Sequence, residues 1–185
     1  MAGGVMDRKT SSTVAAENTE QLKAFDSIGM QRLVDVVRAT GARNIVIAGG
    51  LDWAYDISGV INGYALDDRG GHGVIYCTHV YSWKKGWQAK FLDVAAHHPI
   101  IITECGAPQE RLPFITEDAH EAPDTWVPDF LGLVQKHKLH WTGWSFHPKA
   151  SPVLLNDWTY EPTPYWGAPA KRALAGEPFE LQRMR

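Results

Sequence analysis

The chain has 185 residues, of which 44% are hydrophobic and 21% charged, and its formal net charge is −3. The length predicts one sizeable domain, and the composition excludes a disordered or fibrous protein. No long basic run is present, which argues against a nucleic-acid partner, and no apolar stretch approaches the roughly 20 residues that cross a bilayer.

The first part of the chain is polar and rich in Ser and Thr, without hydrophobic periodicity. We therefore expect residues 1–27 to form a tail or arm and residues 28–185 to form the domain. Met1 to Ser12 lacks the apolar stretch of a signal peptide, so nothing at this end directs export. A first helix is predicted from Leu22 to Thr40, where apolar residues recur at helical spacing before Gly41.

The rest of the chain alternates short apolar runs with amphipathic stretches. The runs predict buried strands at Asn44–Ala48, Gly73–Tyr81, Pro99–Thr103 and His140–Phe146. The amphipathic stretches predict helices at Lys84–His97 and Asp124–Lys138, and a last helix is expected at Pro169–Ala175. Leu51–Gly71 is loop-like with weak helical content. Strands separated by helices indicate an α/β fold with parallel strands, and four such units are half of an eight-fold barrel.

Each predicted strand ends in a polar or aromatic group, as expected where parallel strands present their functional side chains. Glu104 is the sharpest case, because it follows the apolar run Ile100 to Ile102 and Thr103. Its carboxylate is either a functional group or a cap or ion-pair partner. His79 and Tyr81 share one face of the preceding strand and could orient Glu104 and keep it ionised.

The remaining reactive side chains do not predict a metal or cofactor. Cys77 and Cys105 are too few for a metal cluster, and their positions argue against a disulfide between them, so both are expected to be free and buried. The histidines lack the spacing of a metal triad. We expect no cofactor and no metal.

Five blocks in order resemble glycoside hydrolase family five, the family of endo-β-1,4-glucanases. They are Gly49-Gly-Leu-Asp-Trp-Ala-Tyr-Asp56, Thr78-His-Val-Tyr-Ser-Trp-Lys-Lys85, Ile102-Thr-Glu-Cys-Gly106, Gly143-Trp-Ser-Phe146 and Asp157-Trp-Thr-Tyr-Glu-Pro-Thr-Pro164. The similarity extends from about Gly29 to Ala175. It implies that the four strands are the fifth to eighth of a (β/α) eight-fold barrel, and so the C-terminal half of a cellulase-like enzyme.

The resemblance also implies roles for single residues. Glu104 matches the nucleophile of a retaining mechanism, and His79 and Tyr81 match the pair that contacts the sugar and orients the nucleophile. Trp144 matches the tryptophan that lines the subsite of the cleaved sugar. Trp53 lies where a loop of the family borders the cleft. His147, which directly follows the last predicted strand, is a further candidate for binding the substrate.

One part of the family's pattern is missing. The family places an Asn-Glu pair, whose glutamate is the acid/base, at the end of strand four, and this sequence has no Asn-Glu-Pro motif. Glu17 and Glu20 are the acidic residues nearest the expected place, in a polar setting unlike a strand end.

Three hypotheses remain open. The chain is a cellulase-like hydrolase acting as a homodimer or with a complementing half barrel, a β-glucan-binding half barrel that does not cut, or a truncated fragment. Family members are commonly secreted, which suggests an extracellular compartment.

Overall fold

The computed structural model of the chain describes residues 28–185. These residues fall into two compact units, one of residues 28–46 and 66–73 and the other of residues 47–65 and 74–185. The predicted boundary at residues 27 and 28 coincides with the start of the described residues, so the division into a tail and a domain stays a prediction.

The smaller unit contains helix α1, Gly29–Ala39, and the segment 66–73. The helix confirms the described part of the expectation for Leu22–Thr40, while residues 22–27 lie outside the described range. Arg38 near the end of α1 pairs with Asp68 at 2.5 Å, and the Arg38 side chain is 7% exposed. This ion pair joins the helix to the second segment of the unit.

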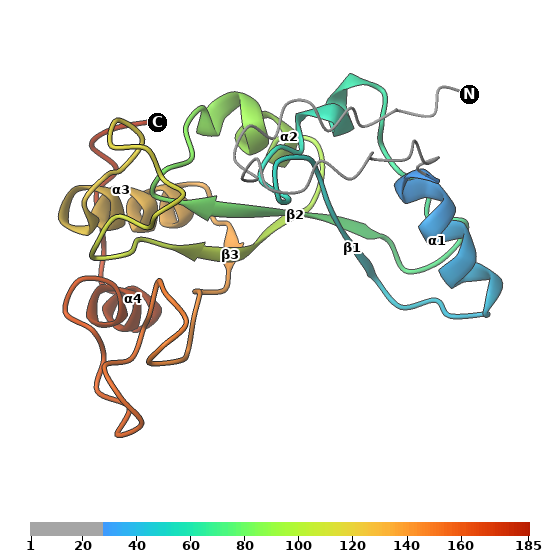
Figure 1. Ribbon diagram of the computed structural model, residues 1–185. Helices are drawn as coiled ribbons and strands as arrows, with labels where there is room; N and C mark the ends of the chain where they lie inside the picture. The colour runs from blue at the N-terminus through green and yellow to red at the C-terminus, as the bar shows by residue number, and fades with distance from the viewer. Residues whose placement is uncertain (1–27) are drawn as a thin grey trace, which may run out of the picture. The chain divides into compact units, whose positions relative to one another are not determined.

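In the described part of the chain, four strands form one sheet in the order β1-β2-β3-β4. They are β1 (Val46–Gly49), β2 (Val74–Tyr81), β3 (Ile100–Gly106) and β4 (His140–Trp141). Strand β3 is parallel to both β2 and β4, and in Figure 1 the arrowheads of β2 and β3 point the same way. The α/β class with parallel strands is confirmed.

Short helices alternate with these strands, as the hydrophobic pattern predicts. Between β1 and β2 lies the 3-10 helix η2 (Ser58–Asn62), and between β2 and β3 lie the π-helix η3 (Gln88–Leu92) and α2 (Asp93–Ala95). Helix α3 (Pro123–Lys136) precedes β4, and α4 (Gly167–Leu174) follows it. The helix expected at Lys84–His97 begins four residues late, because the Lys84 amide closes a turn onto the Tyr81 carbonyl oxygen at 2.9 Å.

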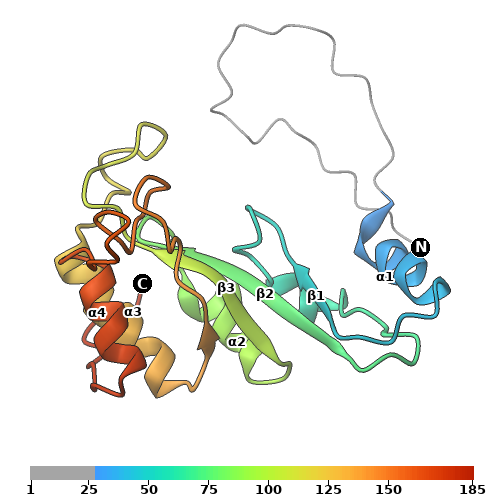
Figure 2. The same ribbon diagram turned by 90° about the horizontal axis from the view of Figure 1, so that it is seen from below.

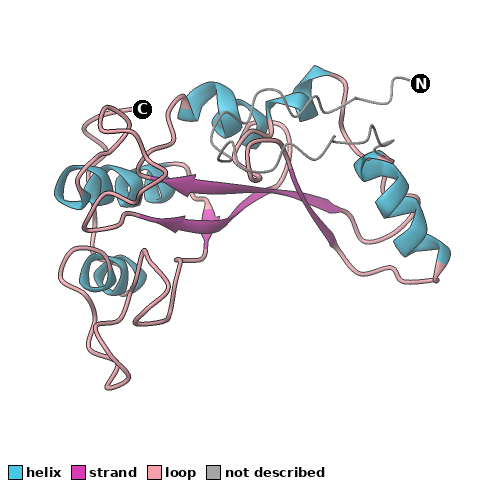
Figure 3. Ribbon diagram, in the orientation of Figure 1, coloured by secondary structure: helices cyan, strands magenta, loops and turns pink. Residues whose placement is uncertain are grey.

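The strand expected over His140–Phe146 begins at His140, as predicted, but ends at Trp141. Figure 3 shows a very short β4 followed by loop. Thr142 and Trp144 still donate backbone hydrogen bonds to Ile102 and Cys105 of β3, at 2.9 and 2.8 Å. The Ser145 amide instead donates to the Pro152 carbonyl oxygen at 2.6 Å, so the chain turns into its own loop there.

The larger unit has an aromatic core formed by Trp87, Trp126, Phe130 and Trp166, all with 0% exposure. Trp126 and Phe130 lie one turn apart on α3 and stack at 4.7 Å between ring centroids. Trp166, at the start of α4, contacts both rings edge-on. Burying these aromatic side chains removes a large apolar area from water and so stabilises the unit.

Candidate functional site

The carboxyl ends of the strands carry the residues that the sequence singled out. Figure 2 shows the loop after β3 and the loop between β4 and α4 at the same end of the strands. In a parallel α/β sheet this end collects functional side chains, since every strand is followed there by a loop.

Glu104 occupies the third position from the end of β3, and its Cα partner on β2 is His79. The pairing depends on a shift of register between Thr78 and His79, because Thr78 pairs with Ile102. If the register that pairs Thr78 with Ile102 continued without the shift, Glu104 would lie opposite Val80, which is fully buried. The shift therefore moves the carboxylate to the more exposed face of the sheet.

Two polar side chains of β2 approach the same oxygen of Glu104. The Tyr81 hydroxyl donates a hydrogen bond to Glu104 Oε2 at 2.6 Å, and His79 Nδ1 lies 3.4 Å from that oxygen. The expected placement of Glu104 beside Tyr81, with His79 on the same side, is confirmed. Burial, with the Glu104 carboxylate next to it, raises the pKa of Tyr81, which keeps the hydroxyl a neutral donor.

Trp83 supports Tyr81 from the loop after β2. The two rings stack at 4.6 Å with 7° between their planes, and Phe114, from the loop after β3, meets Trp83 edge-on at 5.6 Å. Sequence reasoning missed both aromatic residues. The alternation of His79, Tyr81 and Trp83 was a signal that could have identified Trp83, whereas Phe114 is brought close by the tertiary fold.

Trp53 lies in a turn after β1, with positive backbone φ values at Asp52, Trp53 and Ala54. Its side chain is 77% exposed. Lys84 crosses from the loop after β2, with Nζ 2.7 Å from Asp52 Oδ2 and 5.7 Å from the Trp53 ring centroid. The turn therefore presents a flat aromatic face with one cation beside it.

Trp144 and His147 lie on the loop after β4. The Trp144 side chain is partly exposed, and its carbonyl oxygen accepts a hydrogen bond from Trp166 Nε1 at 2.9 Å. His147 Nδ1 accepts from the Lys149 amide at 2.9 Å, and the His147 ring meets Trp158 edge-on at 4.9 Å. Within residues 28–185, no hydrogen bond, ion pair or ring contact joins Glu104 directly to Trp53, Trp144 or His147.

Two cysteines lie on the strands of this site, and the Cys105 thiol donates a hydrogen bond to the Thr142 carbonyl oxygen at 3.3 Å. Cys77 and Cys105 are both free and buried, as expected. Burial, reinforced by the nearby Glu104 carboxylate, raises the pKa of the Cys105 thiol and keeps it protonated. Residues 28–185 contain no group of three His, Cys, Asp or Glu side chains placed to hold a metal ion. No helix in the same range has the length and apolar character that a membrane span requires.

The family model for cellulase, glycosyl hydrolase family 5, matches residues 17–150. The chain belongs to glycoside hydrolase family 5. The match includes Tyr81 and Glu104 on their strands and Trp53 and Trp144 on the loops that follow β1 and β4. Glu17 and Glu20 fall inside the matched range but outside the described residues.

Solved structures agree with the family 5 assignment. A β-glucanase from Saccharophagus degradans is 26% identical, with a TM-score of 0.65 over 79% of this chain and 46% of that one. Its complex with cellotetraose matches at 25% identity and the same TM-score and coverage. A β-mannanase from Streptomyces thermolilacinus, solved with mannohexaose, has a TM-score of 0.54 at 18% identity, over 83% of this chain and 53% of that one. Among curated proteins, none matches.

The chain spans about half the length of these proteins, 46% and 53%. Its four parallel strands with their helices correspond to half of the family 5 (β/α)8 barrel. The fold expected from the sequence, a half barrel of this type, is confirmed.

Proposed function

We propose that this chain is the nucleophile-bearing half of a retaining β-1,4-glucan hydrolase, with Glu104 as the nucleophile. The observation that carries the proposal is the hydrogen bond from Tyr81 to Glu104 at 2.6 Å, at the carboxyl end of β3 in a family 5 half barrel. A carboxylate held at a strand end by a neutral hydrogen-bond donor is oriented for attack.

In this mechanism Glu104 attacks the anomeric carbon of the bound sugar, the glycosidic bond from that carbon to the leaving oxygen breaks, and a covalent glycosyl-enzyme intermediate forms. The Tyr81 hydroxyl fixes the carboxylate through Oε2, and His79 lies on the same oxygen at 3.4 Å. Water then releases the sugar with its anomeric configuration retained. Trp144 and Trp53 contact the glucan, since exposed aromatic faces with polar edges suit the two sides of a sugar ring. His147, half-buried on the same loop as Trp144, is a further contact.

A retaining mechanism needs a second carboxyl group about 5–5.5 Å from the first, to protonate the leaving oxygen. Within residues 28–185, the side chains bonded or ion-paired to Glu104 are those of Tyr81 and His79. We propose that the acid comes from a complementing half of the barrel. Loss of general acid help costs about 10² to 10⁴ in rate, so this chain by itself hydrolyses glucan weakly or not at all.

Symmetric pairing of two copies would not restore the acid. If the four strands of a second copy took the places of strands one to four, its β4 would occupy position four. The acid's place would then hold the second copy's Trp144 to His147 segment. The two Glu104 side chains would lie on opposite strands of the barrel, farther apart than the retaining distance of about 5–5.5 Å.

The second candidate is a β-glucan-binding half barrel that does not cut. The observation that favours it is the 77% exposure of Trp53, whose ring is open for contact with a sugar. The chain spans 46% of the β-glucanase, so it offers part of a binding surface without the second carboxyl group. Cellotetraose binding is expected in both cases, so turnover separates the two.

The test measures reducing ends released from a soluble cellulose derivative by the chain alone and by the chain mixed with the first four strands of the S. degradans β-glucanase. We expect little turnover alone and a clear gain in the mixture. Glu104→Gln abolishes the gain, and Glu180→Gln, the same change at an exposed position, keeps it.

Two outcomes decide against the proposal. Turnover in the mixture that survives in Glu104→Gln would remove Glu104 as the nucleophile. Robust turnover by the chain alone, lost in Glu104→Gln, would show that the acid lies in this chain, with Glu17 and Glu20 the first positions to test.

A further inference from the structure

A row of aromatic rings leads away from Glu104. Tyr81 donates to the carboxylate, Trp83 stacks on Tyr81 at 4.6 Å, and Phe114 meets Trp83 at 5.6 Å. The Phe114 side chain is nevertheless 62% exposed. The row therefore begins at the proposed nucleophile and ends in an aromatic ring that is open to solvent.

Contacts within the loop that carries Phe114 hold this side chain at the surface. Ile115, the next residue, is buried, and its amide donates to the Leu112 carbonyl oxygen at 2.9 Å. Arg111 Nη1 donates to the Ile115 carbonyl oxygen. With its neighbour anchored in this way, Phe114 is presented outward from an ordered turn.

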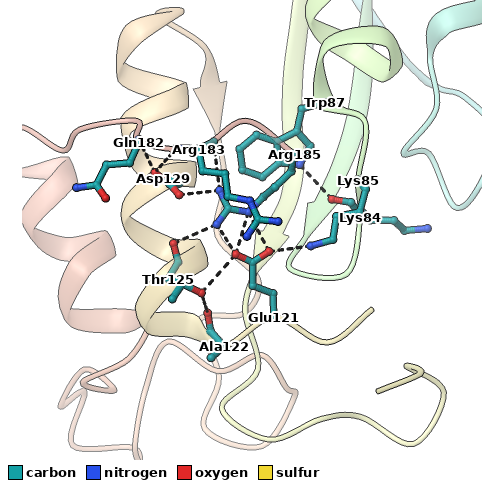
Figure 4. Close-up of polar contacts among 10 residues, drawn as sticks. All are labelled: Lys84, Lys85, Trp87, Glu121, Ala122, Thr125, Asp129, Gln182, Arg183 and Arg185. Carbon is teal, nitrogen blue, oxygen red and sulfur yellow. Dashed lines mark hydrogen bonds and ion pairs between the residues drawn. The ribbon is translucent and has the colours of Figure 1, made fainter. Parts of the chain in front are cut away.

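An ionic cluster around Arg185 joins the two loops that supply this pair of rings (Figure 4). Glu121, near the end of the loop after β3, accepts from Arg185 Nε at 2.9 and 3.0 Å and from Lys85 Nζ at 2.7 Å. Lys85 lies two residues after Trp83 on the loop after β2. Glu121 therefore connects the Trp83 loop and the Phe114 loop to Arg185.

The cluster is anchored in the core of the unit. Arg185 has a 1% exposed side chain, lies over the Trp87 ring at 5.2 Å and pairs with Asp129 of α3 at 2.8 Å. Burial by itself would raise the pKa of Glu121, but the hydrogen bonds from Arg185 and Lys85 outweigh it and lower that pKa to about 2. The Glu121 carboxylate thus stays charged, and its ion pairs with Arg185 and Lys85 persist, at any pH at which a glycosidase of this kind would be assayed.

We propose that Trp83 and Phe114 form a glucan-stacking subsite beside Glu104, and that Arg185 is the positioning residue that holds their two loops in place. The inference rests on the proposed function and adds to it a place for the sugar next to the one attacked. Its ligand is a β-1,4-glucan chain.

The chemistry of the ring faces favours glucose over mannose. All ring substituents of a β-linked glucosyl unit are equatorial, so both faces present C–H groups that suit an aromatic ring. A mannosyl unit carries an axial hydroxyl on C2, which places a polar group on one face. Stacking on Phe114 therefore contributes more to the binding of cellotetraose than of mannotetraose.

The test is calorimetric titration of the chain with cellotetraose and mannotetraose. Phe114→Ala is the principal variant, because an exposed side chain can be removed without loss of the fold. We expect its affinity for cellotetraose to fall about tenfold, which corresponds to the loss of one aromatic contact, with a smaller fall for mannotetraose. Trp83→Ala should weaken binding at least as much, since it also frees Tyr81.

Arg185→Met and the milder Arg185→Lys test the positioning role, with Arg38→Met as the matched control. The control removes another buried arginine ion pair, Arg38 with Asp68, in the other compact unit. All three should lower the melting temperature. Only the Arg185 variants should lower the affinity for cellotetraose, by about tenfold at a temperature where circular dichroism shows them folded.

The outcomes separate this inference from the proposed function. A wild-type chain that binds no glucan overturns both. If wild type binds cellotetraose and Phe114→Ala binds it with the same affinity, the subsite is overturned and the proposed function is not. The subsite is likewise overturned if Phe114→Ala changes only self-association, as measured by sedimentation. Folded Arg185 variants with wild-type affinity overturn the positioning role.

Discussion

The aromatic core and residues 47–49 of the edge strand β1 belong to the same compact unit but are covered to very different degrees. Trp87, Trp126 and Trp166 have no exposed surface, whereas Ile47 on β1 is 53% exposed and Trp53, just beyond it, is 77% exposed. In a closed barrel β1 would have a further strand at its free edge. The comparison shows that helices cover the aromatic core, whereas side chains on and just beyond the edge strand β1 are exposed.

The largest effect should come from Trp126→Ala in the covered region. Removing a fully buried tryptophan leaves a cavity among Trp87, Phe130 and Trp166. Loss of a large aromatic side chain from a core costs about 3–5 kcal/mol. Urea unfolding followed by circular dichroism measures the loss, and a midpoint equal to that of wild type would contradict a tightly packed core.

Arg185→Met should lower the free energy of unfolding by about 3 kcal/mol, because it leaves the Glu121 and Asp129 carboxylates without their buried partner. The cluster also predicts a pH dependence. The pKa of Glu121 lies near 2 in the folded chain, below its usual 4.5. Its contribution is therefore complete above pH 4.5 and is lost as the pH falls towards 2.

Melting curves of wild type and Arg185→Met between neutral pH and pH 2 test this linkage. Wild type should lose more stability than the variant over the acid range, so that the two curves converge. Parallel curves would mean that Glu121 is not coupled to Arg185.

Ile47→Lys should weaken self-association, or binding to a complementing half barrel, by about tenfold. A lysine on the edge strand opposes pairing with a further strand, while it costs the folded chain little at a position that is already half exposed. Ile61→Lys is the matched control, since Ile61 is also exposed but lies in η2, away from the sheet edge. Sedimentation velocity measures the effect, and a wild-type chain that stays monomeric at high concentration would exclude the dimer.

Trp53→Ala should have the smallest effect on stability, although it makes the same chemical change as Trp126→Ala. The exposed ring contributes a cation–π contact with Lys84, worth about 0.5–1 kcal/mol at such a site. Cellotetraose affinity should nevertheless fall, because we propose that this ring contacts the glucan. A stability loss approaching that of Trp126→Ala would show that the turn after β1 is part of the core.

Much of the fold follows from local sequence pattern. The β-branched and aliphatic runs predict β1 to β3 within a few residues, because buried parallel strands require continuous apolar segments. Helices α3 and α4 follow in the same way from their amphipathic spacing. Five blocks in order also indicate the family, and with it the type of barrel and the candidate nucleophile.

The sequence by itself therefore determined that Glu104 ends an apolar strand and that His79 and Tyr81 share a face of its neighbour. The tertiary structure decided that the three side chains meet, through a register shift of one residue that places Glu104 opposite His79 instead of Val80. It also decided where β4 ends and that Arg185 pairs with Glu121, 64 residues away. Local pattern cannot determine such features, because strand register and long-range ion pairs depend on the packing of segments far apart in the chain.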